Sequence, residues 1–208
     1  MQQDLQIMMD PHATLAEQTQ ASMDFVLRME FWRGLLKATA GDGGSPVSIS
    51  TDGGRLQITD AQQLMDMRDE AIVQRLLYNN GKGAAASAVV NIMGDDGMYM
   101  SADASAPDPA GAQYNLAKGD GGGPQCAECQ LALKIDQYAQ KGGKLPNVIV
   151  MVEQQRAGRP PCGSCQLNVP KILGKYDRPI VIYNASDMSA APYVWIPPGW
   201  IPPGTPVA

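Results

Sequence analysis

The sequence of 208 residues predicts an α/β fold, in which helices cover both faces of one sheet in three layers. Residues 147–152 and 179–183 are continuous apolar runs, which are typical of strands buried on both faces. Residues 84–104 alternate around a Gly-Asp-Asp-Gly turn and predict a hairpin. Two cysteine pairs each open a stretch with helical spacing. The expected order is therefore hairpin, helix, strand, helix, strand.

Residues 1–80 are expected to form a helical accessory region with a small hairpin. Thr14 and Glu17 have the spacing of a capping box, which predicts the start of the first helix. Two interpretations stay open: the region is an accessory to the fold, or it completes the core. The elements expected here are a helix over 13–38, short strands over 47–50 and 55–58, and a helix over about 61–79.

Residues 81–190 are expected to form the main domain, and residues 191–208 a tail rich in proline and tryptophan. Pro170 is expected to interrupt or begin the second helix of the domain. The tail repeats the sequence Trp-Ile-Pro-Pro-Gly, and adjacent prolines favour polyproline II, which cannot join a central strand. We expect the tail to wrap its own domain and bury the Trp rings, the alternative being that it docks on a partner.

The charge balance is acidic, with a formal net charge of −5 and a pI near 4.8. This argues against a protein that grips duplex nucleic acid through a strongly basic surface. A small neutral substrate fits more easily, although a local basic rim is compatible with an acidic total. The sequence has neither an apolar stretch of roughly 20 residues nor a signal peptide, which predicts no membrane span and a cytoplasmic location.

The four cysteines form two close pairs, Cys126 with Cys129 and Cys162 with Cys165. In a chain without a secretory signal, such pairs indicate metal or redox chemistry before disulfides. Helix N-termini suit thiolates, because backbone N–H groups and the helix dipole stabilise negative sulfur. Three thiolates would leave a tetrahedral zinc ion one open position for water.

Cys126-Ala127-Glu128, followed by Pro161 and the pair Cys162 and Cys165, resembles the cytidine deaminase superfamily. The signature of that family is His or Cys, any residue, Glu, and later Pro-Cys-any-any-Cys. The resemblance covers about residues 84–184. It implies a hydrolase with Zn²⁺ held by Cys126, Cys162 and Cys165, and with Glu128 as the proton shuttle. It also implies a deaminase-like zinc domain over residues 81–190.

The same resemblance implies that Asn91, Ala127, Pro161 and Asn115 line the substrate site. Asn91 has a plainer interpretation, as a strand residue bonded to neighbouring backbone. In free-nucleoside deaminases an Asn-any-Glu motif holds the ribose near the position of Asn115, and here the Glu is missing. This departure favours cytosine in single-stranded or unstacked nucleic acid, as in bacterial toxin deaminases that are delivered into a target cell. Free cytidine, deoxycytidine or a nucleotide is the alternative substrate, and small members of the family often form homo-oligomers.

The same cysteines also fit a structural zinc site with four sulfur ligands, in which Cys129 is the fourth. The stretch between Cys129 and Cys162 is longer than the roughly 15–20 residues of such sites, and a long helix and a strand intervene. The deaminase interpretation is therefore preferred. Under it, Cys129 packs as a small buried hydrophobe or approaches the metal. A thioredoxin-like redox role is a third, more distant interpretation.

Overall fold

The computed structural model divides the chain into two compact units, Met1–Asp42 and Gly43–Ala208, and each is described by itself. In the first unit, the Thr14 N–H donates to Glu17 Oε2 at 2.8 Å and the Glu17 N–H to Thr14 Oγ1 at 3.3 Å. The predicted capping box is confirmed, and the rest of the helix expected as far as residue 38 lies mostly outside the described residues. The structure describes residues 7–8, 10, 12–21, 23–24, 47–77, 85–89, 99–103, 109–118, 123–153, 161–184, 187, 190–202, 205 and 207.

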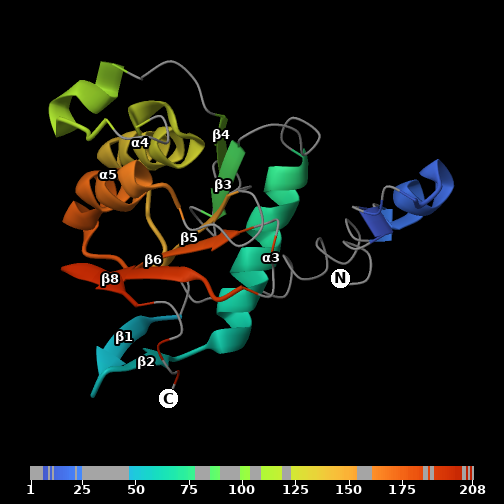
Figure 1. Ribbon diagram of the computed structural model, residues 1–208, viewed down its shortest axis with the longest axis horizontal. Coiled ribbons are helices and arrows are strands. Elements are labelled where there is room, and N and C mark those ends of the chain that lie inside the picture. The colour runs from blue at the N-terminus through green and yellow to red at the C-terminus, as the bar shows by residue number, and fades with distance from the viewer. Residues whose placement is uncertain are drawn as a thin grey trace. The chain divides into compact units, whose positions relative to one another are not determined.

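The second unit is built on a six-stranded sheet of order β4-β3-β5-β6-β7-β8, with a separate two-stranded sheet of β1 and β2 (Figure 1). Strands β5 and β6 are parallel, and the other neighbours in the large sheet are antiparallel. The strands are β1 (Ile49–Asp52), β2 (Arg55–Ile58), β3 (Ala85–Val89), β4 (Tyr99–Asp103), β5 (Ile149–Glu153), β6 (Ile180–Asn184), β7 (Tyr193–Ile196) and β8 (Gly199–Ile201).

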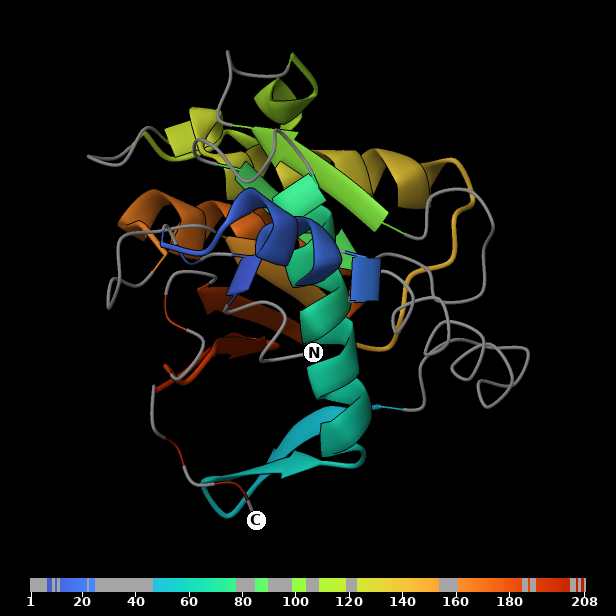
Figure 2. The same ribbon diagram turned by 90° about the vertical axis from the view of Figure 1, so that its right-hand side faces the viewer.

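Helices lie on both faces of the large sheet. Helix α3 (Ala61–Leu77) packs against β3 and β5, while α4 (Ala127–Gln140) and α5 (Gly163–Leu173) pack on each other (Figure 1). Figure 2 shows α3 in front of the sheet. The predicted α/β class is confirmed. No helix in the described ranges combines the length and the hydropathy that a membrane span needs.

Burial on both faces explains why β5 has no polar alternation until its last residue. Ile149 and Met151 belong to the core cluster that α4 and α5 cover, whereas Val150 and Val152 are buried in the intervening positions. Because side chains alternate across a strand, the two pairs point to opposite faces. The continuous apolar run is therefore what a strand between two helical layers requires.

Helix α3 packs on β3 and β5 and buries apolar residues of its own. The Gln63 N–H donates to Asp60 Oδ1 at 2.9 Å, so Asp60 caps the helix, and Leu64, Met67 and Ile72 are buried. For residues 47–77, the packing of α3 on the sheet supports the interpretation in which the region completes the core. Along the chain, the two compact units meet between residues 42 and 43.

The tail differs from the polyproline II segment expected from its sequence. Residues 193–201 form β7 and β8, which extend the large sheet from β6. Pro197 and Pro198 occupy the turn between these strands, where no ladder N–H is needed, and the strands keep the aromatic and β-branched residues. The expectation that the tail packs on its own domain is confirmed for Trp195, which is 7% exposed and lies in the core.

Pro170 neither interrupts nor begins α5, which runs through it from Gly163. A proline inside a helix has no N–H for the carbonyl four residues earlier, here that of Gln166. The indole N–H of Trp200 donates to this carbonyl at 2.7 Å. The tail therefore supplies the hydrogen bond that Pro170 cannot make, and the Gln166 carbonyl keeps a partner.

A buried carboxylate fastens the far end of α4 to two short 3₁₀ segments, η2 (Pro109–Tyr114) and η4 (Gly174–Tyr176). Burial raises the pKa of Asp136, but hydrogen bonds from Lys175, Tyr114 and Tyr176 outweigh this effect and hold the pKa below its usual value. Asp136 accepts hydrogen bonds from Tyr114 Oη, from Tyr176 Oη at 2.6 Å and from Gln140 Nε2 at 2.7 Å, and it pairs with Lys175 Nζ at 2.6 Å.

Candidate metal centre

Two helix N-termini bring the cysteine pairs together. Cys126 is the N-cap of α4 and Cys162 the N-cap of α5, and the two helices pack side by side. Both N-cap residues have extended backbone, with ψ of 144° and 152°. The Cys165 N–H donates to Cys162 Sγ at 3.4 Å, so a thiol takes the role of a capping oxygen. This is the placement that the sequence predicts for both pairs.

Three sulfurs form a compact group. Cys126 Sγ lies 3.5 Å from Cys162 Sγ, which lies 3.2 Å from Cys165 Sγ, and all three are within 4.8 Å of one another. None of the four cysteines forms a disulfide. Tetrahedral zinc with Zn–S bonds of about 2.3 Å would separate its sulfur ligands by about 3.8 Å. The three sulfurs can therefore hold a metal ion after small adjustments.

Glu128 lies beside this group. It is in the first turn of α4, is 6% exposed, and its Oε2 accepts a hydrogen bond from Cys165 Sγ at 3.4 Å. A carboxylate at a helix N-terminus is stabilised by the helix dipole. Its oxygens do not join the group of mutually close donors. Glu128 is thus placed next to the candidate ligands without being one of them.

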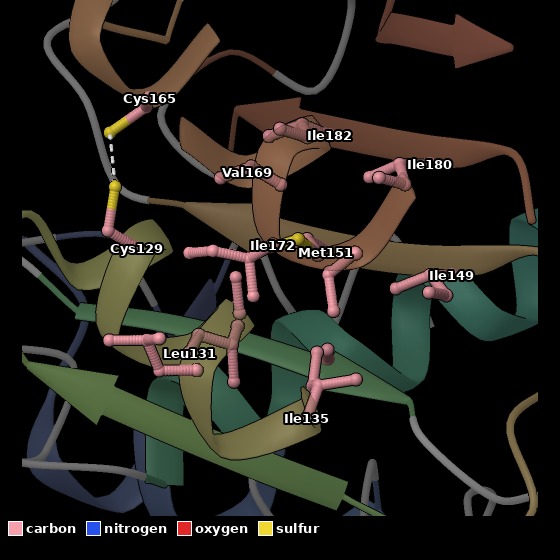
Figure 3. Packing of buried hydrophobic residues seen from close by; sticks show 14 of the residues in the cluster. Cys129, Leu131, Ile135, Ile149, Met151, Cys165, Val169, Ile172, Ile180 and Ile182 are labelled. Atoms are coloured by element: carbon pink, nitrogen blue, oxygen red, sulfur yellow. Dashed lines mark hydrogen bonds between the residues drawn. The ribbon is translucent and has the colours of Figure 1, made fainter. Parts of the chain in front are cut away.

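Cys129 lies in the core beside one of the three candidate ligands. Its side chain is 0% exposed and belongs to the core cluster. Figure 3 shows its sulfur facing that of Cys165, at 3.8 Å, beside apolar residues such as Leu131 and Ile172. Cys129 does not join the three sulfurs that lie within 4.8 Å of one another. It therefore packs as a buried hydrophobe that touches one candidate ligand.

The thiols of the group differ in acidity. A hydrogen bond from Cys165, helped by one from Cys162, lowers the pKa of Cys126 to about 7, although burial opposes the shift. Burial raises the pKa of Cys162. Hydrogen bonds with Cys126 and Cys129, together with burial, raise the pKa of Cys165. Cys126 is therefore the thiol of the group that loses its proton first, and binding a cation would release the others.

One glutamine in each helix bonds to a backbone carbonyl just before the cysteine pair. The sequence analysis did not predict this role for Gln130 and Gln166. Gln130 Nε2 donates to the Pro124 carbonyl, and Gln166 Nε2 to the Pro161 carbonyl, both at 2.6 Å. The signal was present as a repeat, since Cys-Ala-Glu-Cys-Gln-Leu at 126–131 matches Cys-Gly-Ser-Cys-Gln-Leu at 162–167. Both helices therefore begin with two cysteines followed by a glutamine that bonds to the carbonyl of a preceding proline.

The chemistry of the site fits a bound cation. Three sulfurs are the donors that zinc and other soft metals prefer. Ser164, between Cys162 and Cys165, is 3% exposed, and its Oγ has no hydrogen-bond partner among the described residues. Such a hydroxyl needs an acceptor, and a thiolate or a bound ligand would provide one. The donor set and this hydroxyl agree with a metal centre.

The remaining predicted residues divide into three groups. Ala127 and Pro161 are buried and adjoin Cys126 and Cys162. Asn115 is exposed, with a left-handed φ of 46°, at the end of η2. Asn91 lies outside the described residues. The structure thus gathers the candidate ligands, Glu128, Ala127 and Pro161, and places Asn115 on the surface.

Comparison of the chain with models of known protein families, with curated proteins and with solved structures finds no match. What this centre does must therefore be argued from its own residues: three clustered sulfurs that can hold a metal ion, with a buried carboxylate beside them.

Proposed function

We propose that the protein is a zinc-dependent hydrolytic deaminase that converts a cytosine-type base to uracil. The observation that carries the proposal is the position of Glu128, a buried carboxylate 3.4 Å from Cys165 Sγ and outside the group of sulfur donors. Burying a carboxylate is costly. A purely structural zinc site has no use for one, whereas a hydrolytic site needs a proton carrier beside the metal.

The topology supports this proposal. Strands β3 and β4, helix α4, strand β5, helix α5 and strand β6 follow one another along the chain, and the strands lie in one sheet in the order β4-β3-β5-β6, with β5 and β6 parallel. The resemblance to cytidine deaminases implies that order of elements. The second cysteine pair follows β5, and ligands of α/β sheets bind beyond the carboxyl ends of parallel strands. The zinc site would therefore lie where such folds hold their substrates.

Cys126, Cys162 and Cys165 would hold the zinc ion. Zinc bound by three protein ligands supplies a nucleophilic hydroxide from water near neutral pH. In the net reaction, water adds to the amidine carbon, the carbon–nitrogen bond breaks, ammonia leaves and a carbonyl remains. Glu128 would take one proton of the attacking water and deliver it to the ring nitrogen. It would then carry the remaining hydroxyl proton to the departing amine, which leaves as ammonia while the carbonyl forms, because an amine leaves only when protonated.

The substrate class that we propose is cytosine in single-stranded or unstacked nucleic acid. Free-nucleoside enzymes hold the ribose with an Asn-any-Glu motif, whereas here Asn115 is exposed and Ala117 stands in place of the Glu. Without those contacts to the ribose, contacts to the neighbouring nucleotides would have to supply the binding energy. Enzymes of this kind take an unstacked base into the metal pocket.

A substrate panel tests the proposal. The zinc-loaded protein is incubated with cytidine, deoxycytidine, their phosphates, and single-stranded DNA and RNA containing one cytosine, and the products are read by mass. We expect cytosine in an oligonucleotide to gain about 1 Da, the exchange of NH for O. Turnover of nucleosides alone would show that the substrate is a free nucleoside and would reject the nucleic-acid substrate. No turnover of any of them would reject the enzyme.

A structural zinc module is the second candidate, and one distance favours it. Cys129 Sγ lies 3.8 Å from Cys165 Sγ, about the separation of two sulfurs on one tetrahedral zinc ion. Such a module would stabilise the packing of α4 on α5 without chemistry. It requires Cys129 to approach Cys126 and Cys162 as well, and it gives no role to Glu128. We therefore place it second.

A further inference from the structure

Residues 114–118, the clamped segment, are held along one face of α5 and η4. The three side chains that hold them stand three and four positions apart, so they line one side of the helix and its extension. Each binds a different residue of the segment, in order along the chain. The pairs are Lys175 Nζ with Tyr114 Oη at 2.7 Å, Lys171 Nζ with the Asn115 carbonyl at 2.8 Å, and Asn168 with Ala117.

Asn168 makes the most complete of these contacts. Its Oδ1 accepts a hydrogen bond from the Ala117 N–H at 2.8 Å, and its Nδ2 donates to the Ala117 carbonyl at 3.0 Å. The Asn168 side chain is 0% exposed, so both groups would be costly to leave unpaired. The amide thus fixes the backbone of one residue from both sides, as a neighbouring strand would.

The clamped segment ends against the start of α4. Gly123 has a φ of 62°, and a Cβ there would lie 2.9 Å from the Ala117 carbonyl oxygen and 3.1 Å from Lys118 Cα. Only glycine permits this approach together with that φ. The Gly123 carbonyl accepts the Cys126 N–H at 3.1 Å. In space, Gly123 therefore lies between the backbone of the clamped segment and Cys126, the first candidate metal ligand.

We propose that Asn168 is a positioning residue that holds the clamped segment as a wall of the substrate site beside Cys126. The inference rests on the proposed deaminase function. A substrate ring must be held within a fraction of an ångström of the attacking group, and a misplacement of about 1 Å can cost about 100-fold in rate. Asn168 lies one turn beyond Cys165, so it acts through the segment and touches neither metal nor substrate.

The test compares Asn168→Leu with Ile172→Val, a neighbouring core substitution on α5 that leaves the segment untouched. For the best substrate of the panel, we expect Asn168→Leu to raise KM about tenfold while zinc content stays at the wild-type level. Hydrogen exchange at the Ala117 amide should accelerate in the same variant. Ile172→Val should keep the wild-type KM and the slow exchange.

Each outcome separates the two proposals. If wild type is active and Asn168→Leu has the KM of the Ile172→Val control, the wall role is wrong and the deaminase stands. If wild type turns over no amidine substrate, the deaminase proposal fails and the wall role fails with it. If Asn168→Leu does not fold, Lys171→Met, which releases only the Asn115 carbonyl, should raise KM by a smaller factor, and an unchanged KM would again reject the wall.

Discussion

Cys126 and Cys129 lie three positions apart, and only Cys126 joins the group of three mutually close sulfurs. Cys126 is the extended N-cap residue of α4, and its sulfur meets those of Cys162 and Cys165. Cys129 is inside the helix and points into the core, where its sulfur lies 3.8 Å from that of Cys165. The sequence motif is symmetric in its spacing, whereas the two local environments are different.

Replacing each of these cysteines by serine should distinguish the two candidate functions. Cys126→Ser removes a ligand and should weaken zinc binding by more than about 100-fold, whereas Cys129→Ser should change it by less than about tenfold. Competition with a chromogenic chelator measures both affinities, and circular dichroism controls for folding. Equal losses in the two variants would favour the four-sulfur structural site.

At the scale of elements, α5 depends on the tail of the chain. The helix provides Cys162 and Cys165 at its N-terminus, and it continues through Pro170, which cannot bond to the Gln166 carbonyl. Trp200, on β8, supplies the missing donor. A sheet edge and a helix are therefore coupled by one hydrogen bond, which compensates for a proline in the middle of the helix.

A double-mutant cycle measures this coupling. Trp200→Phe should lower the free energy of unfolding by about 1–2 kcal/mol, because it leaves the part-buried Gln166 carbonyl without a donor. In a Pro170→Ala background the new Ala N–H can bond to Gln166, so the same change should cost about 1 kcal/mol less. Urea unfolding gives the four values. Strictly additive costs would show that the two residues act independently.

At the scale of the molecule, Asp136 ties together parts of the second unit that are far apart in the sequence. It joins η2, α4 and η4 through Tyr114, Lys175 and Tyr176. Its pKa lies below that of an unfolded aspartate, because these hydrogen bonds outweigh burial. Such a group contributes stability above an unfolded pKa of about 3.9 and loses that contribution as the pH falls through its folded pKa.

Asp136→Asn should therefore change the pH dependence of stability as well as its size. At pH 7 we expect a loss of about 2 kcal/mol, since Asn keeps only one acceptor oxygen for these donors and has no charge to pair with Lys175. Below about pH 4 the difference from wild type should shrink. Urea unfolding at pH 7, 5 and 3 tests this, with Asp52→Asn on the exposed hairpin as the control. A difference that stays constant with pH would contradict the account.

What the sequence could predict depended on whether the signal was local. The capping box of Thr14, the turn between β1 and β2, and the buried strands β5 and β6 are local patterns, and the structure contains them. The contacts of Asp136 and of Asn168 join distant positions, so no local pattern indicated them. The tail differs from the prediction because Pro197 and Pro198 lie in the turn between β7 and β8, and the pairing of those strands joins residues that no local pattern identifies.

The candidate site followed the same rule. Cys126, Cys162, Cys165 and Glu128 could be predicted because the motif places them at two helix starts, and packing of α4 on α5 brings them together. Gln130 and Gln166 were visible as a repeat whose use became clear only from their bonds to the preceding carbonyls.

The most direct test of the central claim is the deamination rate of Glu128→Gln at equal zinc content. Gln keeps the size of the side chain but cannot carry the proton, so we predict a rate at least about 100-fold below wild type on the best substrate of the panel. Zinc content and thermal unfolding temperature should stay at wild-type values, because Glu128 is not among the sulfur ligands. A variant that keeps its zinc and deaminates at the wild-type rate would contradict the account.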